Sequence, residues 1–178
     1  AIFMITGMGT VFAAEKAPQA VIDYTNTELV KWGTDPVIVK AVNEENAKNK
    51  TLDQIKELDK KWMATAGVAD FMKAFMDNEC GKHLQDLKKA TPFLVEAFVM
   101  DNQGALVAET DKTSDYWQGD EDKFTKSFNG GKGGIDIGDI KFDDSTQIYE
   151  AQVSVPVKDG DKVIGAITIG IDVDKFKK

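Results

Sequence analysis

The sequence contains no arginine, because all 22 of its basic residues are lysines. Arginine is the usual bidentate clamp for carboxylates and phosphates, whereas a lysine holds an anion only as a point charge. The 30 acidic residues leave a net charge of −8, which would repel a phosphate backbone. We therefore expect no nucleic acid partner, and any anionic ligand would depend on lysine alone.

Cysteine and histidine occur once each, as Cys80 and His83. A single cysteine allows no internal disulfide, and a single histidine excludes a His-rich metal site and a histidine-based catalytic triad. Carboxylate pairs are common in so acidic a chain, so they give no specific support to glycosidase chemistry. The sequence thus predicts no enzymatic activity, no metal and no cofactor.

Long apolar runs are absent after the first 14 residues. Residues 1–14 are apolar and end in Val11-Phe-Ala13, which is typical of a signal-peptide cleavage site, and the chain turns polar at Glu15. We interpret 1–14 as a signal-peptide remnant or, alternatively, as a truncated N-terminal anchor. The mature protein is then expected to begin near Ala14 and to be periplasmic or otherwise exported, with membrane anchoring as the alternative.

The first half of the chain predicts helices. Apolar residues recur at helical spacing over 18–46, and the Asp35-Pro36 step should kink or restart that helix. Thr51 has the pattern of an N-cap for a second helix. A third helix is predicted over about 69–89, weakened in its middle by Gly81.

The second half predicts an antiparallel sheet. Two hairpins and a polar, aromatic insert are expected: strands over 93–101 and 105–109, the insert over 113–124, and strands over 146–157 and 162–173. A short helix should begin at the acidic 120–122 segment and end near Phe128. The glycine cluster 129–134 then connects the insert to the next strand. The prediction is one α+β domain over 15–178, helical over 18–90 and sheet over 93–174.

Residues of the strand after Thr146 alternate in character. Val153, Val155 and Val157 point one way, and Glu150 and Gln152 point the other. One face of the sheet is therefore suited to packing on the long helix. The opposite face is either solvated or lines a polar cavity.

Four segments, in this order, resemble the Cache sensor family, also called PDC-type or extracytoplasmic PAS-like domains, of the single-Cache kind. The segments are Val99-Met-Asp-Asn-Gln-Gly104, Asp143-Asp-Ser-Thr146, Val155-Pro-Val-Lys-Asp-Gly160 and Ile164-Gly-Ala-Ile-Thr-Ile-Gly-Ile-Asp172. The resemblance implies a PAS-like antiparallel five-stranded sheet with a long N-terminal helix packed on one face. It also implies that the opposite face and its loops bind amino acids, organic acids or amines. Such a domain usually lies between two membrane spans of a chemoreceptor or sensor kinase, so the chain is either an excised domain or a free-standing exported binding protein.

Some of the ligand-binding positions of the family can be matched to residues of this chain. Amino-acid-binding members carry an arginine and aromatic residues after the second strand, and an aspartate on the last strand. Here Trp117 matches an aromatic position, Asp115 stands near the place of the arginine, Phe142 stands where a tyrosine would be, and Asp172 matches the aspartate. The complete predicted ligand-binding set is Asp115, Tyr116, Trp117, Gln118, Lys123, Phe142, Gln152 and Asp172. Acids and aromatics in place of the arginine favour a cationic or neutral ligand.

Two functions fit these observations. The first is a non-enzymatic extracytoplasmic sensor domain that holds a small molecule between the sheet and the 113–124 loop. Its partners would be that ligand, a membrane receptor or assembly, and a second copy bound through the long N-terminal helix. The second is an accessory subunit that keeps the fold without a ligand, with Tyr116 and Trp117 as a hydrophobic plug. A cavity filled by Trp117 and Phe142 would favour the accessory subunit, and an open one with Asp115, Gln152 and Asp172 would favour the sensor.

Overall fold

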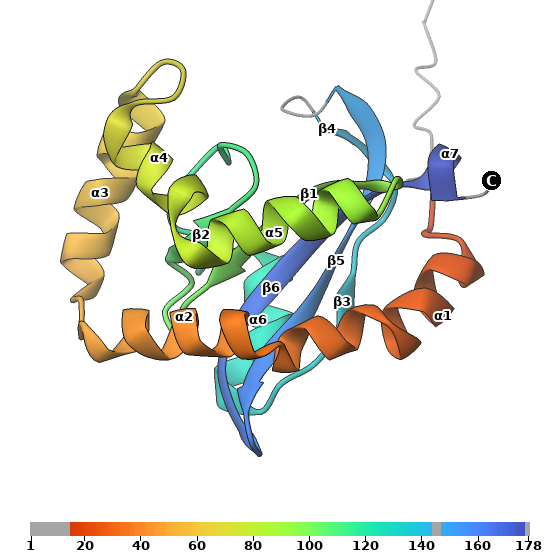
Figure 1. Ribbon diagram of the computed structural model, residues 1–178, viewed down its shortest axis with the longest axis horizontal. Coiled ribbons are helices and arrows are strands. Elements are labelled where there is room, and N and C mark those ends of the chain that lie inside the picture. Colours follow the sequence, from red (N-terminus) through yellow and green to blue (C-terminus); the bar gives the residue numbers. More distant parts are fainter. Residues whose placement is uncertain (1–14, 144–146, 177–178) are drawn as a thin grey trace, which may run out of the picture.

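A computed structural model describes residues 15–143 and 147–176 (Figure 1). The predicted signal segment 1–14 lies outside the described residues. The helices are α1 (Gln19–Thr27), the 3-10 helix η1 (Leu29–Thr34), α2 (Pro36–Ala47), α3 (Leu52–Ala64), α4 (Asp70–Asp77), α5 (Glu79–Ala90), α6 (Asp122–Phe128), the 3-10 helix η2 (Asn129–Gly131) and α7 (Val173–Phe176). No helix in the described ranges is long and apolar enough to span a membrane.

The sheet is antiparallel and has six strands. They are β1 (Leu94–Met100), β2 (Leu106–Glu109), β3 (Asp136–Ile137), β4 (Lys141–Asp143), β5 (Ile148–Asp159) and β6 (Lys162–Asp172). The order is β2-β1-β6-β5-β3, and β4 also pairs with β5. The predicted α+β fold is confirmed, with one strand more than expected because β3 and β4 share the outer edge of β5.

The long N-terminal helix is divided where proline predicts a restart. Asp35 caps α2, since its Oδ1 accepts hydrogen bonds from the backbone N–H of Val37 (2.8 Å) and Ile38 (3.3 Å). Thr51 and Gln54 form the capping box expected at the start of α3. The result is a broken rod of α1, η1 and α2 lying across the sheet (Figure 1).

The third predicted helix is in fact two helices, so that prediction is wrong. Asn78 ends α4 and caps α5, because its Oδ1 accepts from the backbone N–H of Gly81 at 2.7 Å while its Nδ2 donates to the carbonyl of Val107 at 3.0 Å. Gly81 lies against the end of α4, and a β-carbon there would come within 2.5 Å of the carbonyl oxygens of Phe75 and Met76. The break therefore falls at the capping residue, and the glycine serves the close approach of the two helices.

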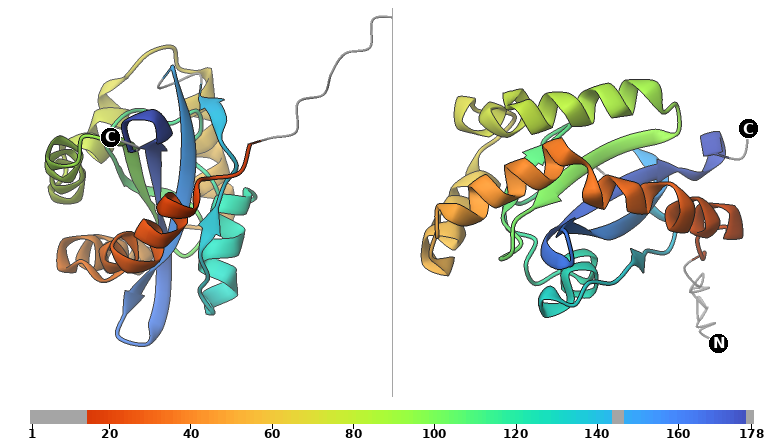
Figure 2. Two further views of the ribbon diagram at one scale, coloured as in Figure 1. Left: turned by 90° about the vertical axis from the view of Figure 1, so that its right-hand side faces the viewer. Right: turned by 60° about the horizontal axis from the view of Figure 1, so that its bottom comes forward.

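The two faces of the sheet are covered differently. Figure 2 shows α1, α2 and α5 on one face and α6 on the other. Val153, Val155 and Val157 pack with the first group of helices in one buried core, as the strand alternation predicts. Glu150 and Gln152 point to the other face, which α6 and the insert cover. The predicted short helix ending near Phe128 is α6.

Candidate functional site

On the polar face of the sheet, one row of residues crosses three neighbouring strands, and the central residue of the row is a glycine. Gly170 on β6 pairs in register with Glu96 on β1 and with Gln152 on β5. Because Gly170 has no side chain, Gln152 reaches across it, and its Nε2 donates to Glu96 Oε1 at 2.8 Å and to Glu150 Oε1 at 3.2 Å. A β-carbon at position 170 would lie 2.7 Å from Glu96 Cγ and 2.8 Å from Glu150 Oε2. The glycine thus lets two carboxyl groups converge on one point of the sheet.

These two carboxyl groups are buried side by side, near enough for each to affect the pKa of the other. Two ionised carboxylates this close repel each other, which favours a proton on one of them. Burial, followed by the nearby Glu96 and Asp143, raises the pKa of Glu150 to about 8. Burial and Asp143 also raise the pKa of Glu96, against the opposing effect of Lys123. The pair therefore holds a proton near neutral pH.

The insert that covers this face is held from α3. Asp59 Oδ1 accepts hydrogen bonds from the backbone N–H groups of Tyr116 (2.9 Å) and Trp117 (3.0 Å). Trp62 Nε1 donates to the carbonyl of Thr113 at 2.9 Å. Asp59 and Trp62 are both buried, so these bonds fix the backbone of the insert.

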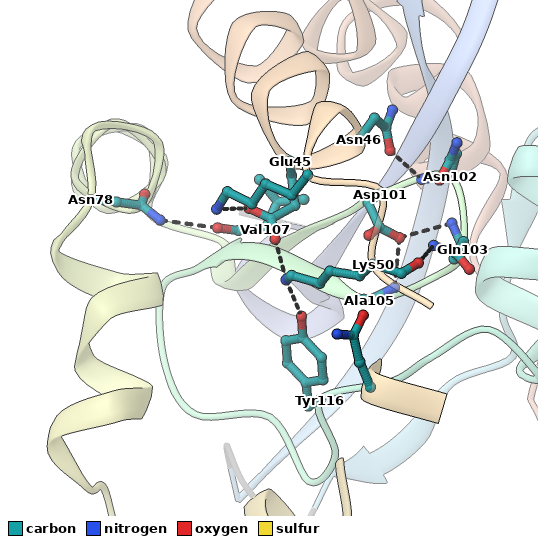
Figure 3. Close-up of polar contacts among 12 residues, drawn as sticks. Glu45, Asn46, Lys50, Asn78, Asp101, Asn102, Gln103, Ala105, Val107 and Tyr116 are labelled. Atoms are coloured by element: carbon teal, nitrogen blue, oxygen red, sulfur yellow. Dashed lines mark hydrogen bonds and ion pairs between the residues drawn. The ribbon is translucent and has the colours of Figure 1, made fainter. Parts of the chain in front are cut away.

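A second set of contacts ties the insert to the junction of α2 and α3 (Figure 3). Lys50 Nζ donates to Tyr116 Oη at 2.9 Å and forms an ion pair with Glu45. The carbonyl of Lys50 accepts from Gln103 Nε2 at 2.8 Å, and Asp101 Oδ1 accepts from the backbone N–H groups of Gln103 (2.8 Å) and Ala105 (3.0 Å). The turn between β1 and β2, the insert and α2 thus share one buried polar network.

A cavity of about 270 Å³ lies between the sheet and the insert. Its floor and walls come from four parts of the fold: Glu96, Phe98 and Gln152 on the sheet, Thr113, Ser114 and Gln118 on the insert, Lys123 on α6, and Phe142 and Asp143 on β4. Lys123 Nζ lies 5.3 Å from the centre of the Phe98 ring and 3.1 Å from Glu121 Oε2. The lining therefore combines aromatic rings with both signs of charge, acids outnumbering the lysine.

Gln118 lines this cavity and has a buried acceptor without a hydrogen-bond partner among the described residues. The side chain is 1% exposed, and its Nε2 donates to the carbonyl oxygen of Asp115 (2.9 Å) and to Asp115 Oδ1 (3.1 Å). Both contacts are acceptors, so the orientation of the amide is fixed and Oε1 faces away from them. Within residues 15–143 and 147–176, Oε1 has no hydrogen-bond partner. A buried acceptor left unpaired is costly, and a ligand that donates a hydrogen bond would remove that cost.

Four residues of the predicted binding set line the cavity together. They are Gln118, Lys123, Phe142 and Gln152. Phe142 is 45% exposed and meets Tyr149 edge to face at 5.2 Å between ring centres. Their ligand-binding role remains a prediction, and their common position is what makes it testable.

The other four lie elsewhere. Asp115 does not line the cavity, and its carbonyl and side-chain oxygens accept hydrogen bonds from Gln118 Nε2. Tyr116 is fully buried against Trp62 and Phe75, and Trp117 Nε1 donates to the carbonyl of Gln103 at 2.8 Å. Asp172 caps α7 through the backbone N–H groups of Asp174 (3.1 Å) and Lys175 (2.9 Å). Burial opposes ionisation of Asp172, but Lys175 outweighs it and holds the pKa of Asp172 below its ordinary value.

Sequence reasoning missed Glu96 and Asp143 and did not include Glu150 in the binding set. A usable signal was present for Glu96, since a glutamate stands alone in the otherwise apolar strand Leu94–Met100. Gly170 in the middle of a long strand is a second signal, because an interior glycine marks a place where other groups approach the backbone closely. Only the pairing register shows that these positions are adjacent.

A separate hollow of about 180 Å³ lies between α2 and α5, near the network of Figure 3. Its charged residues Lys40, Lys48, Glu45 and Glu79 pair with one another, and burial raises the pKa of Cys80 to about 12. The thiol is therefore unreactive. Among the described residues no group of three His, Cys, Asp or Glu side chains is placed to hold a metal ion.

No protein-family model matches the sequence, and no curated protein matches it. Solved structures do resemble it in fold. The sensor domain of the histidine kinase DctB from V. cholerae has 13% sequence identity and a TM-score of 0.51, over 89% of this chain and 52% of that one. The ligand-binding domain of the Campylobacter jejuni chemoreceptor Tlp3 with L-valine has 15% identity and a TM-score of 0.43, over 90% and 66%. The E. coli DcuS sensor domain has 13% identity and a TM-score of 0.39, over 70% and 93%.

The chain spans about half the length of the DctB sensor domain. At this level of identity the likeness concerns the fold alone. The antiparallel sheet and the N-terminal helices across one of its faces agree with the arrangement that the resemblance implies. This chain has the fold of the Cache, PDC-type sensor domains.

Proposed function

We propose that this chain is a non-enzymatic, extracytoplasmic sensor domain that binds a small cationic or neutral molecule between the sheet and the 113–124 segment. The single observation that carries the proposal is the cavity under the insert, whose lining includes Gln118, a residue with a buried acceptor that has no partner among the described residues. Among the described residues that line the cavity, Glu96 and Asp143 are acids and Lys123 is the single base, which disfavours a simple carboxylate as ligand. The fold shared with the sensor domain of a histidine kinase supports a receptor context.

The accessory-subunit alternative has less support. It would require a cavity filled by Trp117 and Phe142. Trp117 packs on the β1–β2 turn, away from the cavity, and Phe142 stands half exposed at its wall. A homodimer through α1 and α2, a membrane receptor as partner and a periplasmic location stay predictions of the proposed function.

A thermal-shift screen tests the proposal directly. Amines, polyols, amino acids and organic acids would be compared at equal concentration, because a ligand that binds only the folded state raises the melting temperature. We expect stabilisation by amines or neutral compounds. Stabilisation by dicarboxylates alone would contradict the proposed charge and assign the anchor to Lys123. No stabilisation by any class, followed by no binding in calorimetry, would favour the accessory subunit.

Substitution of Phe142 locates the site. Phe142→Ala should weaken binding of the screened ligand about tenfold or more, since stacking on an aromatic ring contributes roughly 1–2 kcal/mol to a cation. Its melting temperature should change little, because the side chain is 45% exposed. Tyr149→Ala is the matched control: that ring contacts Phe142, is 60% exposed and does not line the cavity. Equal loss of affinity in both variants would place the ligand elsewhere.

A further inference from the structure

The carboxyl pair lies where two hollows adjoin: Glu96 lines the cavity of about 270 Å³, and Glu150 lines a neighbouring one of about 140 Å³ that shares Phe142, Asp143 and Gln152 with it. The proton that two such close carboxyl groups share is a small positive charge. Glu96 and Glu150 converge over Gly170, and Gln152 Nε2 donates to one oxygen of each. A single proton then relieves the repulsion between the two carboxyl groups. A small cation with N–H donors carries the same charge and the same kind of donor as that proton.

Other features of the cavity suit the same chemistry. Gln118 Oε1 has no donor among the described residues, and an ammonium group has N–H donors that a carboxylate lacks. Phe98 and Phe142 supply ring faces and edges to the lining, and the Phe98 ring already accepts one ammonium, that of Lys123 at 5.3 Å. The cavity thus accommodates an ammonium group beside an aromatic ring.

We propose that the cavity selects small ammonium compounds, and that binding exchanges the proton shared by Glu96 and Glu150 for the ligand's ammonium group. The displaced proton leaves to the solvent, and both carboxylates become ionised acceptors for the ligand. The inference rests on the proposed function, because it names the ligand class and the regulation of the same site.

The charges around the pair set the direction of the pH effect. Asp143 on β4 and Asp172 on β6 are acids near the pair, Glu109 on β2 is neutral below about pH 8, and Lys123 on α6 is the base that faces Glu96. Acids hold the proton on the pair, so an incoming cation must compete with it. Affinity for an ammonium compound should therefore rise with pH until the pair is ionised.

The experiment is isothermal titration calorimetry of the full chain with butylammonium, n-butanol, butyrate and γ-aminobutyrate. We expect the two ammonium compounds to bind more tightly than the alcohol and the carboxylate. Between about pH 6 and pH 7 their affinity should rise about tenfold, and runs in buffers of different ionisation enthalpy should show about one proton released per ligand. Tighter binding of γ-aminobutyrate than of butylammonium would show that Lys123 pairs with the carboxylate of the ligand.

Two isosteric variants and one control complete the design. Glu150→Gln and Glu96→Gln remove one acid of the pair and should abolish proton release and the pH dependence. Glu44→Gln makes the same change of net charge at an exposed position on α2 and should leave both intact. Melting curves of each variant check that it is folded.

The outcomes separate this inference from the proposed function. Binding of butyrate or n-butanol without binding of either ammonium compound would overturn the inference and leave the sensor role standing. Ammonium binding without proton release, or with unchanged proton release in both pair variants, would also overturn it. Absence of binding by any compound in this set and in the wider screen would overturn the proposed function itself.

Discussion

Glu109 is a buried carboxyl group whose contacts fit only its protonated form. Its Oε2 accepts the backbone N–H of Thr113 at 3.1 Å and lies 3.1 Å from Thr113 Oγ1, which also lies 2.8 Å from the carbonyl oxygen of Asp115. One hydroxyl proton cannot serve both oxygens, so a protonated Glu109 that donates to Thr113 Oγ1 accounts for the contacts of Oε2, while Oε1 has no hydrogen-bond partner among the described residues. Burial raises the pKa of Glu109 to about 8, from an ordinary value of 4.5.

This pKa makes stability depend on pH. Because the folded-state pKa lies above the unfolded value, the contribution of Glu109 is complete below about pH 4.5 and is lost as pH rises through about 8. We predict that Glu109→Gln raises the free energy of unfolding at about pH 9 by on the order of 1–3 kcal/mol and flattens its decline with pH. Urea unfolding across the pH range measures this.

The matched comparison is Glu44→Gln on the exposed face of α2. It should leave the pH profile of the wild type unchanged. Because Glu150 has a similarly raised pKa, part of the fall in unfolding free energy with rising pH should remain in both variants. If Glu109→Gln and wild type fall in parallel from acid to alkaline pH, the carboxyl is ionised in the folded protein and the proposed proton arrangement is wrong.

The residues of the site show what a sequence can and cannot reveal. Gln152 was predicted because alternation along β5 separates polar from apolar side chains. Tyr116 and Trp117 entered the predicted set because they stand in a polar segment, yet one is core and the other packs on the β1–β2 turn. Local polarity does not tell which way an insert faces, and here Asp59 and Trp62, more than 50 positions away, decide it.

At the scale of elements, α3 acts as the support of the insert. Asp59 lies on its buried side and accepts two backbone N–H groups of the insert. We predict that Asp59→Ala lowers the free energy of unfolding by about 1–3 kcal/mol, because two buried donors lose their partner. It should also weaken ligand binding by releasing the wall formed by Thr113 and Gln118.

The control for this prediction is Glu57→Ala, an exposed acid on the same helix. Chemical unfolding should find its stability within about 0.5 kcal/mol of the wild type. Amide exchange over residues 113–118 should accelerate in the Asp59 variant and not in the control. Unchanged exchange in the Asp59 variant would mean that the insert is held by Trp62 and Lys50 without it.

The elements themselves were largely accessible from sequence. Proline at 36, the cap at Thr51 and the turn residues at 102–104 and 158–161 act locally, and the observed boundaries follow them closely. The break at Asn78 was missed because apolar residues recur at helical spacing on both sides of it, although the Asn78 cap on Gly81 is local; the second bond of Asn78, to the carbonyl of Val107, is a tertiary contact. β3 and β4 are so short that their pairing with β5, and not their own pattern, defines them.

On the scale of the whole molecule, the sheet separates two layers with different roles. Figure 2 shows α1, α2 and α5 on one face and α6 on the other. The first face is packed with apolar side chains, and the second carries the polar cavity. Apolar packing resists local opening more strongly than a wet, polar layer does. Ligand binding should therefore slow local opening more in the layer of the insert and α6 than in the layer of α1, α2 and α5.

We predict that a ligand found by screening slows hydrogen exchange over residues 113–124, β4 and α6, while the amides of α1 and α2 change little. The reason is that the cavity is lined by the insert, β4, α6 and the sheet, and by no residue of α1 or α2. Exchange measured by mass spectrometry, with and without saturating ligand, gives the map. Protection centred on α2 and α5 would instead assign the ligand to the hollow between those helices, and Phe142→Ala, which leaves that hollow intact, would then bind as the wild type does.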